Sequence, residues 1–120
     1  MRKLTLIFLF LEVSTVCLAA PALRDGDIVF RSEEGRFAQA IQLATHSPYN
    51  HVGMVLYRNG KPYVFEAVGP VKYTPLEEWI QGAKGGQYAV KRLKDADKVL
   101  TPEVLKKLNA LARKFKSSGI

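Results

Sequence analysis

The sequence predicts an α+β fold in which a small, mainly antiparallel sheet is flanked by helices. Two stretches rich in β-branched and aromatic residues, 49–58 and 61–67, are separated by a two-residue turn signal. Apolar residues recur at helical spacing in residues 36–45 and 101–116. The chain has 120 residues, a length that suits one domain.

The turn signal is Asn59-Gly60, because both central positions of a tight two-residue hairpin turn need a positive φ. A turn at these residues fixes the register of the two strands, so that Val55 faces Val64. Side chains alternate along each strand, so the register also decides which residues share a face.

This register brings two polar side chains together. Gly53 falls opposite Glu66, and His51 lies two residues before Gly53 on the same face. Gly53 has no side chain that could separate the carboxylate from the imidazole. A His beside a carboxylate is the base and the orienting group of a nucleophilic triad, so His51 and Glu66 are the candidate catalytic residues. The alternative is structural: His51 bonds a carbonyl or water, and backbone donors hold Glu66.

The segment before the hairpin predicts one strand and one helix. Residues 28–30 form a short apolar run after a turn at 23–27, which indicates a buried strand. Ser32 is placed to cap a helix over residues 36–45. Pro48 ends that helix, because the residue before a proline avoids the α conformation.

The segment after the hairpin predicts two more helices and a strand. Thr74 is the expected N-cap, with Pro75 at the first position, of a short helix whose apolar face includes Trp79. Residues 88–93 predict a strand, and Thr101 caps the final helix. These helices cannot cover both apolar faces of the hairpin. We therefore expect exposed apolar surface and a tendency to associate.

The first residues have the pattern of a secretory signal peptide. Positive residues at 2–3 precede an apolar run at 4–11, and Ala19 and Ala22 offer cleavage sites. We expect residues 1–19 to be a signal peptide, cleaved after residue 19 or 22, and the mature protein to be periplasmic or secreted. A membrane anchor is the alternative, but the apolar run is too short to span a bilayer.

Cys17 is the only cysteine of the chain and falls within this leader. Val16 precedes it, whereas a lipidated cysteine usually follows a small residue, so we do not expect a lipoprotein. Removal of the leader leaves no cysteine for a disulfide, and an apolar core must stabilise the mature domain unaided.

The formal net charge is +7, and the basic excess lies in the C-terminal quarter. From Lys91 onward, nine Lys and Arg residues stand against three Asp and Glu. No helix-turn-helix, RNP or zinc-finger pattern accompanies this charge, so we expect no nucleic-acid partner. Anionic cell-surface polymers or lipid head groups are possible contacts, and a solvated helix face is the simpler alternative.

A metal site would have to combine Asp25 and Asp27 with His46 or His51. Their spacing matches no metal-binding motif, and turn or cap roles account for both Asp residues. We expect no metal and no cofactor.

Four stretches carry a resemblance to a known family: GDIVF at 26–30, AIQLATHS at 40–47, YNHVGM at 49–54 and YVFEAVGP at 63–70. In this order they resemble the permuted papain-like, NlpC-type cysteine hydrolases, in the YiiX/YebB-like branch. The resemblance extends over residues 23–116, nearly the whole predicted mature chain.

The resemblance implies a circularly permuted papain-like fold, in which the His comes first, the carboxylate follows and the Cys comes last, on a C-terminal helix. His51 matches the general base, and Glu66 matches the residue that orients it. The family's Cys has no counterpart here, because Cys17 precedes the sheet. We therefore expect residues 23–120 to be an incomplete domain that lacks the Cys-bearing part.

With the leader pattern, the resemblance implies an exported cysteine hydrolase, an amidase or peptidase acting on cell-wall peptides or on acyl-amide or ester bonds. A thiolate is the nucleophile of this chemistry, so we expect this chain to be inactive by itself. Two alternatives stay open: a catalytically dead module that binds cell-wall or anionic lipid ligands, and a truncated remnant without function.

Overall fold

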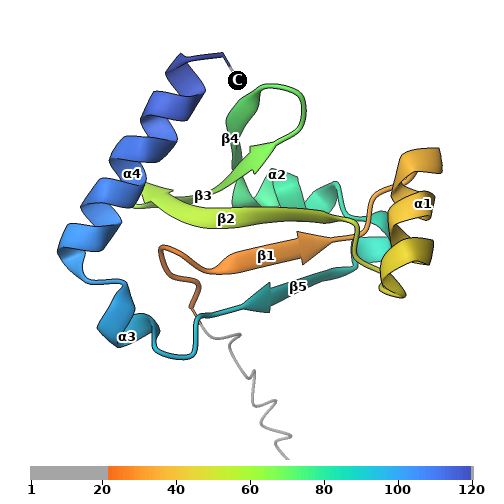
Figure 1. Ribbon diagram of the computed structural model, residues 1–120, viewed down its shortest axis with the longest axis horizontal. Coiled ribbons are helices and arrows are strands. Elements are labelled where there is room, and N and C mark those ends of the chain that lie inside the picture. The colour runs from red at the N-terminus through yellow and green to blue at the C-terminus, as the bar shows by residue number, and fades with distance from the viewer. Residues whose placement is uncertain (1–21, 120) are drawn as a thin grey trace, which may run out of the picture.

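The computed structural model describes residues 22–119, so the predicted signal peptide lies outside the described residues. The elements in chain order are β1 (Ile28–Arg31), α1 (Arg36–Thr45), β2 (His51–Arg58), β3 (Lys61–Ala67), β4 (Val71–Pro75), α2 (Leu76–Gln81), the 3-10 turn η1 (Lys84–Gly86), β5 (Tyr88–Lys91), α3 (Ala96–Val99) and α4 (Pro102–Ser117). The strands form one sheet in the order β4-β3-β2-β1-β5, with every neighbouring pair antiparallel. The predicted α+β class is confirmed (Figure 1).

The β2–β3 hairpin has the predicted turn and register. Asn59 and Gly60 both have positive φ, 51° and 75°, as a tight two-residue turn requires. Val55 pairs with Val64, and the pairing continues to Met54 opposite Phe65. The next residues along the two strands are Gly53 on β2 and Glu66 on β3, the positions on which the site depends.

One face of the sheet carries the apolar core. Val29, Val55 and Val64 project from three neighbouring strands and pack against the fully buried Trp79 of α2. Tyr57 and residues of α2 around Trp79 pack against this cluster. We call this side the α2 face.

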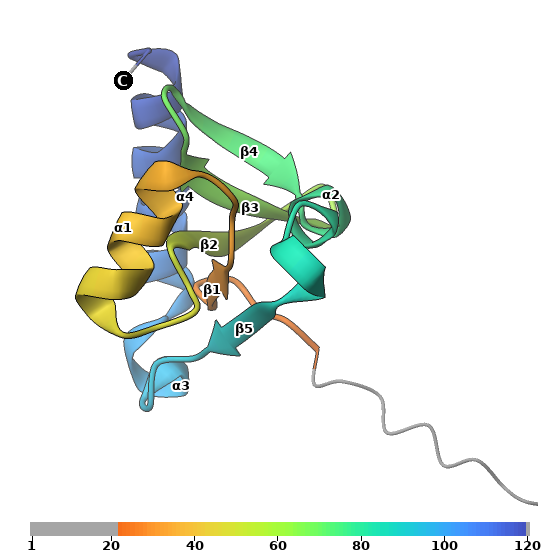
Figure 2. The same ribbon diagram turned by 90° about the vertical axis from the view of Figure 1, so that its right-hand side faces the viewer.

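The opposite face, which we call the open face, is bordered by α1 and α4. Figure 2 shows α1 and α4 on one side of the sheet and α2 on the other. Figure 1 shows α1 and α4 at opposite ends of the sheet. Val52 on this face is 50% exposed, and Phe37 of α1 is 81% exposed. Further exposed apolar side chains include Leu43, Leu111 and Phe115. The expected uncovered apolar surface is confirmed for the described residues, and the tendency to associate stays a prediction.

The prediction of a Thr74 helix cap is wrong. Residues Val71–Pro75 form a strand, β4, which pairs with β3 and adds a fifth strand to the four that were expected. Helix α2 begins at Leu76, after Pro75. The Thr74 hydroxyl donates to Glu66, so it does not cap the helix.

Ser32 also differs from its predicted role. Helix α1 begins at Arg36 with Gly35 as its N-cap, whereas Ser32 is buried and donates its hydroxyl proton to the carbonyl oxygen of Pro48 at 2.6 Å. The bounds of α1 agree with the prediction, and the Thr101 cap of α4 is confirmed by its bond to the backbone N–H of Val104. Within residues 22–119, no helix has both the length and the apolar character that crossing a membrane requires.

Candidate active site

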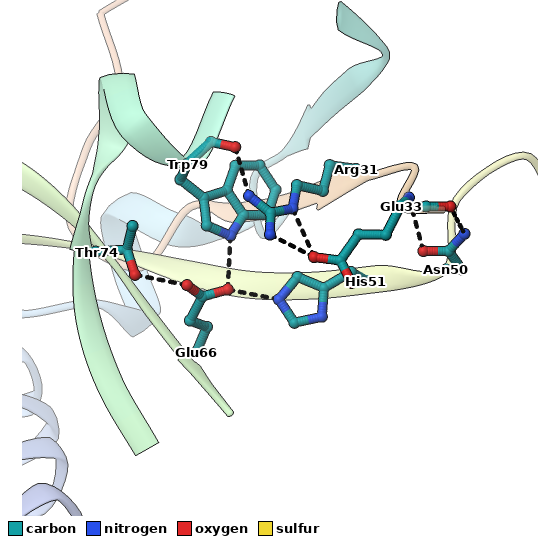
Figure 3. Close-up of polar contacts among 7 residues, drawn as sticks. All are labelled: Arg31, Glu33, Asn50, His51, Glu66, Thr74 and Trp79. Carbon is teal, nitrogen blue, oxygen red and sulfur yellow. Dashed lines mark hydrogen bonds and ion pairs between the residues drawn. The ribbon is translucent and has the colours of Figure 1, made fainter. Parts of the chain in front are cut away.

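His51 and Glu66 meet on the α2 face of the sheet, where the register places them (Figure 3). His51 Nε2 lies 2.5 Å from Glu66 Oε2. The Glu66 side chain is 2% exposed, and the His51 side chain is 12% exposed. A Cβ at position 53 would overlap Cγ1 of Val64, so close packing against Val64 explains why a glycine lies here, opposite Glu66.

Two further donors hold the Glu66 carboxylate. The Thr74 hydroxyl on β4 donates to Oε1 at 2.6 Å, and the indole N–H of Trp79 on α2 donates to Oε2 at 2.9 Å. With the His51 bond, the carboxylate receives hydrogen bonds from three elements of the fold (Figure 3). Such contacts restrict the carboxylate to one orientation.

These contacts keep Glu66 ionised. Burial by itself raises the pKa of a carboxyl group, but the bonds from Thr74, His51 and Trp79 outweigh burial, and the pKa of Glu66 is lowered from its usual value. An ionised carboxylate only accepts hydrogen bonds, so Nε2 of His51 carries the shared proton. In the neutral imidazole, Nδ1 is then the unprotonated nitrogen and the site of any base chemistry.

Nδ1 of His51 points away from Glu66 (Figure 3). No hydrogen bond to Nδ1 is found among residues 22–119. A pocket of about 420 Å³ lies beside His51, between the start of β2, the end of β3 and helix α1. Its wall combines apolar side chains, including Phe37, Ile41 and Val68, with the carboxylates of Glu33 and Glu34. A substrate bound in this pocket would be next to the imidazole.

The other residues considered for metal binding have different partners. Both carboxylate oxygens of Asp27 accept bonds from Arg92, at 2.7 and 2.8 Å, and Asp25 accepts the backbone N–H of Tyr57 at 2.6 Å. His46 ends α1 in the left-handed conformation. Within the part of the chain that the structure describes, no three His, Cys, Asp or Glu side chains are grouped as a metal site.

The sequence predicts neither Thr74 nor Trp79 as a site residue. It predicts Trp79 on the apolar face of a helix, which is correct but incomplete, and Thr74 as the cap of that helix. The available signal was the β-prone composition of residues 71–74, with Val, Tyr and Thr at three of four positions. A strand there would have placed Thr74 on the Glu66 face.

The sequence matches the model of a family described as permuted papain-like amidase enzymes, YaeF/YiiX, over residues 22–116. The chain belongs to this amidase family. It is 45% identical over 113 residues to the uncharacterized protein YiiX of Escherichia coli (strain K12). The crystal structure of the metalloprotein YiiX from Escherichia coli O157:H7 superposes with a TM-score of 0.70 and 49% identity over 77% of this chain.

The chain spans about half the length of these relatives. The aligned part is 94% of this chain but 54% of the K12 protein, and the superposed part is 49% of the crystallised chain. For the matched residues, these comparisons establish the family and the fold.

Proposed function

We propose that residues 22–119 supply the base and its orienting carboxylate to a cysteine-dependent amide hydrolase. The observation that supports this most directly is the short contact between His51 Nε2 and Glu66 Oε2, which leaves Nδ1 directed away from the carboxylate. Cys17, the only cysteine, lies outside the described residues. In this proposal the thiol reaches His51 from outside residues 22–119.

The chemistry follows the logic of a base held by a carboxylate. Nδ1 of His51 accepts the proton of the thiol, and the thiolate forms a bond to the carbonyl carbon of the substrate. The carbon–nitrogen bond breaks, and the imidazolium returns the proton to the leaving amine. Water then hydrolyses the thioester with His51 again as base. Glu66 stabilises the imidazolium and keeps the ring in place throughout.

A small added thiol tests whether His51 can act as the base. The full chain is mixed with 2-mercaptoethanol and p-nitrophenyl acetate, and the release of p-nitrophenolate is followed. We expect thiol-dependent release about tenfold above the reaction without protein, below the usual range for general-base catalysis because the thiol is not held in place.

The variants decide the outcome. His51→Ala should return the rate to that of the thiol alone, and Glu66→Gln should lower it. His46→Asn is the matched control, since His46 is the other histidine of the chain and lies at the end of α1. Equal thiol-dependent rates for the wild type and His51→Ala would contradict the proposal.

The solved relative is described as a metalloprotein, which raises the question of a metal here. The described residues do not fit one: Asp27 is occupied by Arg92, Asp25 by the Tyr57 backbone, and Nε2 of His51 by Glu66. We therefore route no step of the proposed reaction through a metal ion.

Binding to anionic surfaces of the cell envelope is a second candidate function. One corner of the molecule favours it: the Arg58 guanidinium lies 4.3 Å from the Tyr73 ring centroid, and Lys116 Nζ lies 5.7 Å from the same ring. Phe115, beside Lys116 in sequence, is 47% exposed. Charge and exposed aromatic surface together suit lipid head groups.

Vesicle sedimentation tests this second candidate. The chain should sediment with phosphatidylglycerol vesicles at low salt and not with phosphatidylcholine vesicles, and high salt should release it. The double variant Arg58→Gln/Lys116→Gln should lose binding, whereas Arg24→Gln, which changes an arginine paired with Asp97, should retain it. No binding at low salt would exclude this function.

We also propose export, because residues 1–19 have the pattern of a signal peptide. A bacterial host that carries the gene should release protein lacking the first 19 or 22 residues into the periplasm or the medium, as measured by intact mass. An unprocessed mass found only in the cytosol would contradict export.

A further inference from the structure

A closed chain of contacts links His51 back to itself through five other residues. We call it the support ring; its members are His51, Glu66, Trp79, Arg31, Glu33 and Asn50, and Thr74 is attached to it at Glu66 (Figure 3). The first part, from His51 through Glu66 to Trp79, consists of direct bonds to the carboxylate. The second part leads from Trp79 through Arg31, Glu33 and Asn50 back to the backbone of His51.

Arg31 connects Trp79 to the second part of the ring. Its Nη1 donates to the carbonyl oxygen of Trp79 at 2.6 Å, and its guanidinium carbon lies 4.8 Å from the centroid of the indole. Arg31 is also the residue of β1 that pairs with His51 of β2. The guanidinium therefore fixes both the backbone and the ring of Trp79 relative to the strand that carries the base.

Glu33 and Asn50 close the ring. The Glu33 carboxylate accepts Nε of Arg31 at 3.0 Å, and Nη2 donates to the same oxygen. Asn50 is bound at both ends of its amide: Oδ1 accepts the backbone N–H of Glu33 at 3.0 Å, and Nδ2 donates to its carbonyl oxygen at 3.1 Å. Asn50 immediately precedes His51, so the contacts return to the residue from which they start.

Gly82 leaves room for this arrangement. A Cβ at position 82 would lie 2.8 Å from Nη1 of Arg31, closer than a side-chain contact allows. The φ of Gly82 is −74°, which any residue adopts. The absence of a side chain at position 82 is therefore explained by the guanidinium and not by backbone conformation.

We propose that Arg31 is a positioning residue of the His51–Glu66 pair, acting through Trp79. The guanidinium keeps the indole N–H directed at Oε2, and the indole in turn keeps Oε2 directed at Nε2 of His51. The inference rests on the proposed function of the pair. It concerns how the pair is held and can be tested without any substrate.

Two N–H groups report on the ring, and both are easily assigned. Trp79 is the only tryptophan of the chain. His46 is the only other histidine and serves as an internal reference for His51. Hydrogen exchange of the Trp79 indole N–H and of the His51 imidazole N–H is measured by NMR for the full chain. Arg31→Met removes the guanidinium and keeps an apolar stem, so both protons should exchange about tenfold faster with solvent.

Three further variants separate positioning from general stabilisation. Gly82→Ala displaces the guanidinium without removing its charge and should have the same effect as Arg31→Met. Arg31→Lys should fall between the wild type and Arg31→Met, because one ammonium cannot reach both Trp79 and Glu33. Arg58→Met is the matched control, since Arg58 also stacks on an aromatic ring but lies at the other end of β2, and it should leave both protons unchanged.

Two results would overturn the proposal. One is unchanged exchange of both protons in Arg31→Met and Gly82→Ala. The other is an equal acceleration of the backbone amides of β2 and β3, which would show a general loss of stability. Exchange needs no hydrolysis, so its outcome is independent of the thiol assay: a normal response to Arg31→Met with no thiol-dependent rate would refute the proposed function alone.

Discussion

Asp27, immediately before β1, and Glu66, on β3, are both buried carboxylates, and the fold holds them in different ways. Asp27 is 1% exposed and Glu66 is 4% exposed. Asp27 accepts two bonds from the Arg92 guanidinium and one from the backbone N–H of Arg24. Glu66 accepts bonds from a hydroxyl, an indole and an imidazole.

The difference lies in the charge of the partners. Arg92 is a permanent cation, and its bond is the main reason that the pKa of Asp27 is lowered. A guanidinium cannot release a proton at ordinary pH, so the Asp27–Arg92 pair cannot take part in proton transfer. Its role is structural: it joins the start of β1 to the segment after β5. Thr74 and Trp79 are neutral, and the third partner of Glu66 is His51, whose imidazole has one nitrogen that donates and one that can accept a proton. The Glu66 pair can therefore take part in proton transfer.

Truncating each carboxylate should show the largest contrast. Glu66→Ala leaves the N–H of Trp79, the hydroxyl of Thr74 and one nitrogen of His51 without their acceptor. We expect it to lower the free energy of unfolding by about 3–5 kcal/mol, the usual cost of removing one partner of a buried pair. Asp27→Ala should cost less, because the Arg92 side chain is 34% exposed and can turn to water. Urea denaturation measures both. A larger loss for Asp27→Ala would reverse the comparison.

Gly53→Ala should disturb the packing around Glu66 without removing any hydrogen-bonding group. The added methyl group would overlap Cγ1 of Val64, and we expect a loss of about 1–3 kcal/mol, as for other overpacked cores. The double variant Gly53→Ala/Val64→Ala relieves the overlap. Denaturation of the single and double variants should give a favourable coupling between the two sites, and strictly additive losses would show that the overlap is not the cause.

Thr74→Val should have a smaller effect, because it removes one of three bonds to Glu66 and preserves the shape of the side chain. We expect a loss of about 1 kcal/mol, the contribution of a typical hydrogen bond. Thr74→Ser keeps the hydroxyl and is the control. Equal stability of Thr74→Val and the wild type would mean that the Thr74 bond does not stabilise the ionised carboxylate.

The smallest expected effect is on the acid dependence of stability, to which both carboxylates should contribute. Both have a pKa below the usual value in the folded protein. Each group therefore stabilises the fold above the pKa of the unfolded chain, about 4, and this stabilisation is lost as the pH falls through the lower, folded value. Asp27→Asn and Glu66→Gln should each flatten the fall in urea midpoint below about pH 4. A variant that retains the wild-type slope would show that its carboxylate does not contribute.

The His51–Glu66 pair could be predicted from the sequence because it depends on local geometry. Asn59-Gly60 admits one kind of tight turn, the turn fixes the register, and the register places both residues on one face. The helices over residues 36–45 and from Pro102 were predictable for similar reasons, from apolar spacing and from Thr101 and Pro102 at the start of α4.

The surroundings of the pair could not be predicted, because they depend on contacts between distant segments. Thr74 precedes a proline and has a glutamate three residues later, which is a good capping pattern, yet pairing with β3 outweighs it. Arg31 is the last residue of β1, and nothing nearby in sequence points to its contact with Trp79, 48 residues away. Long-range pairing of this kind overrides local preference.

The Asn59-Gly60 turn also limits how this chain can vary in length. Hairpin tips at a surface usually tolerate added residues. Here one extra residue in the turn would shift β3 by one position against β2, and every side chain of β3 would change face. Glu66 would then point to the open face, away from His51, Thr74 and Trp79, although each of these residues would still be present. We therefore expect substitutions at the tip to be tolerated more often than insertions or deletions, even though the tip lies far from the proposed chemistry.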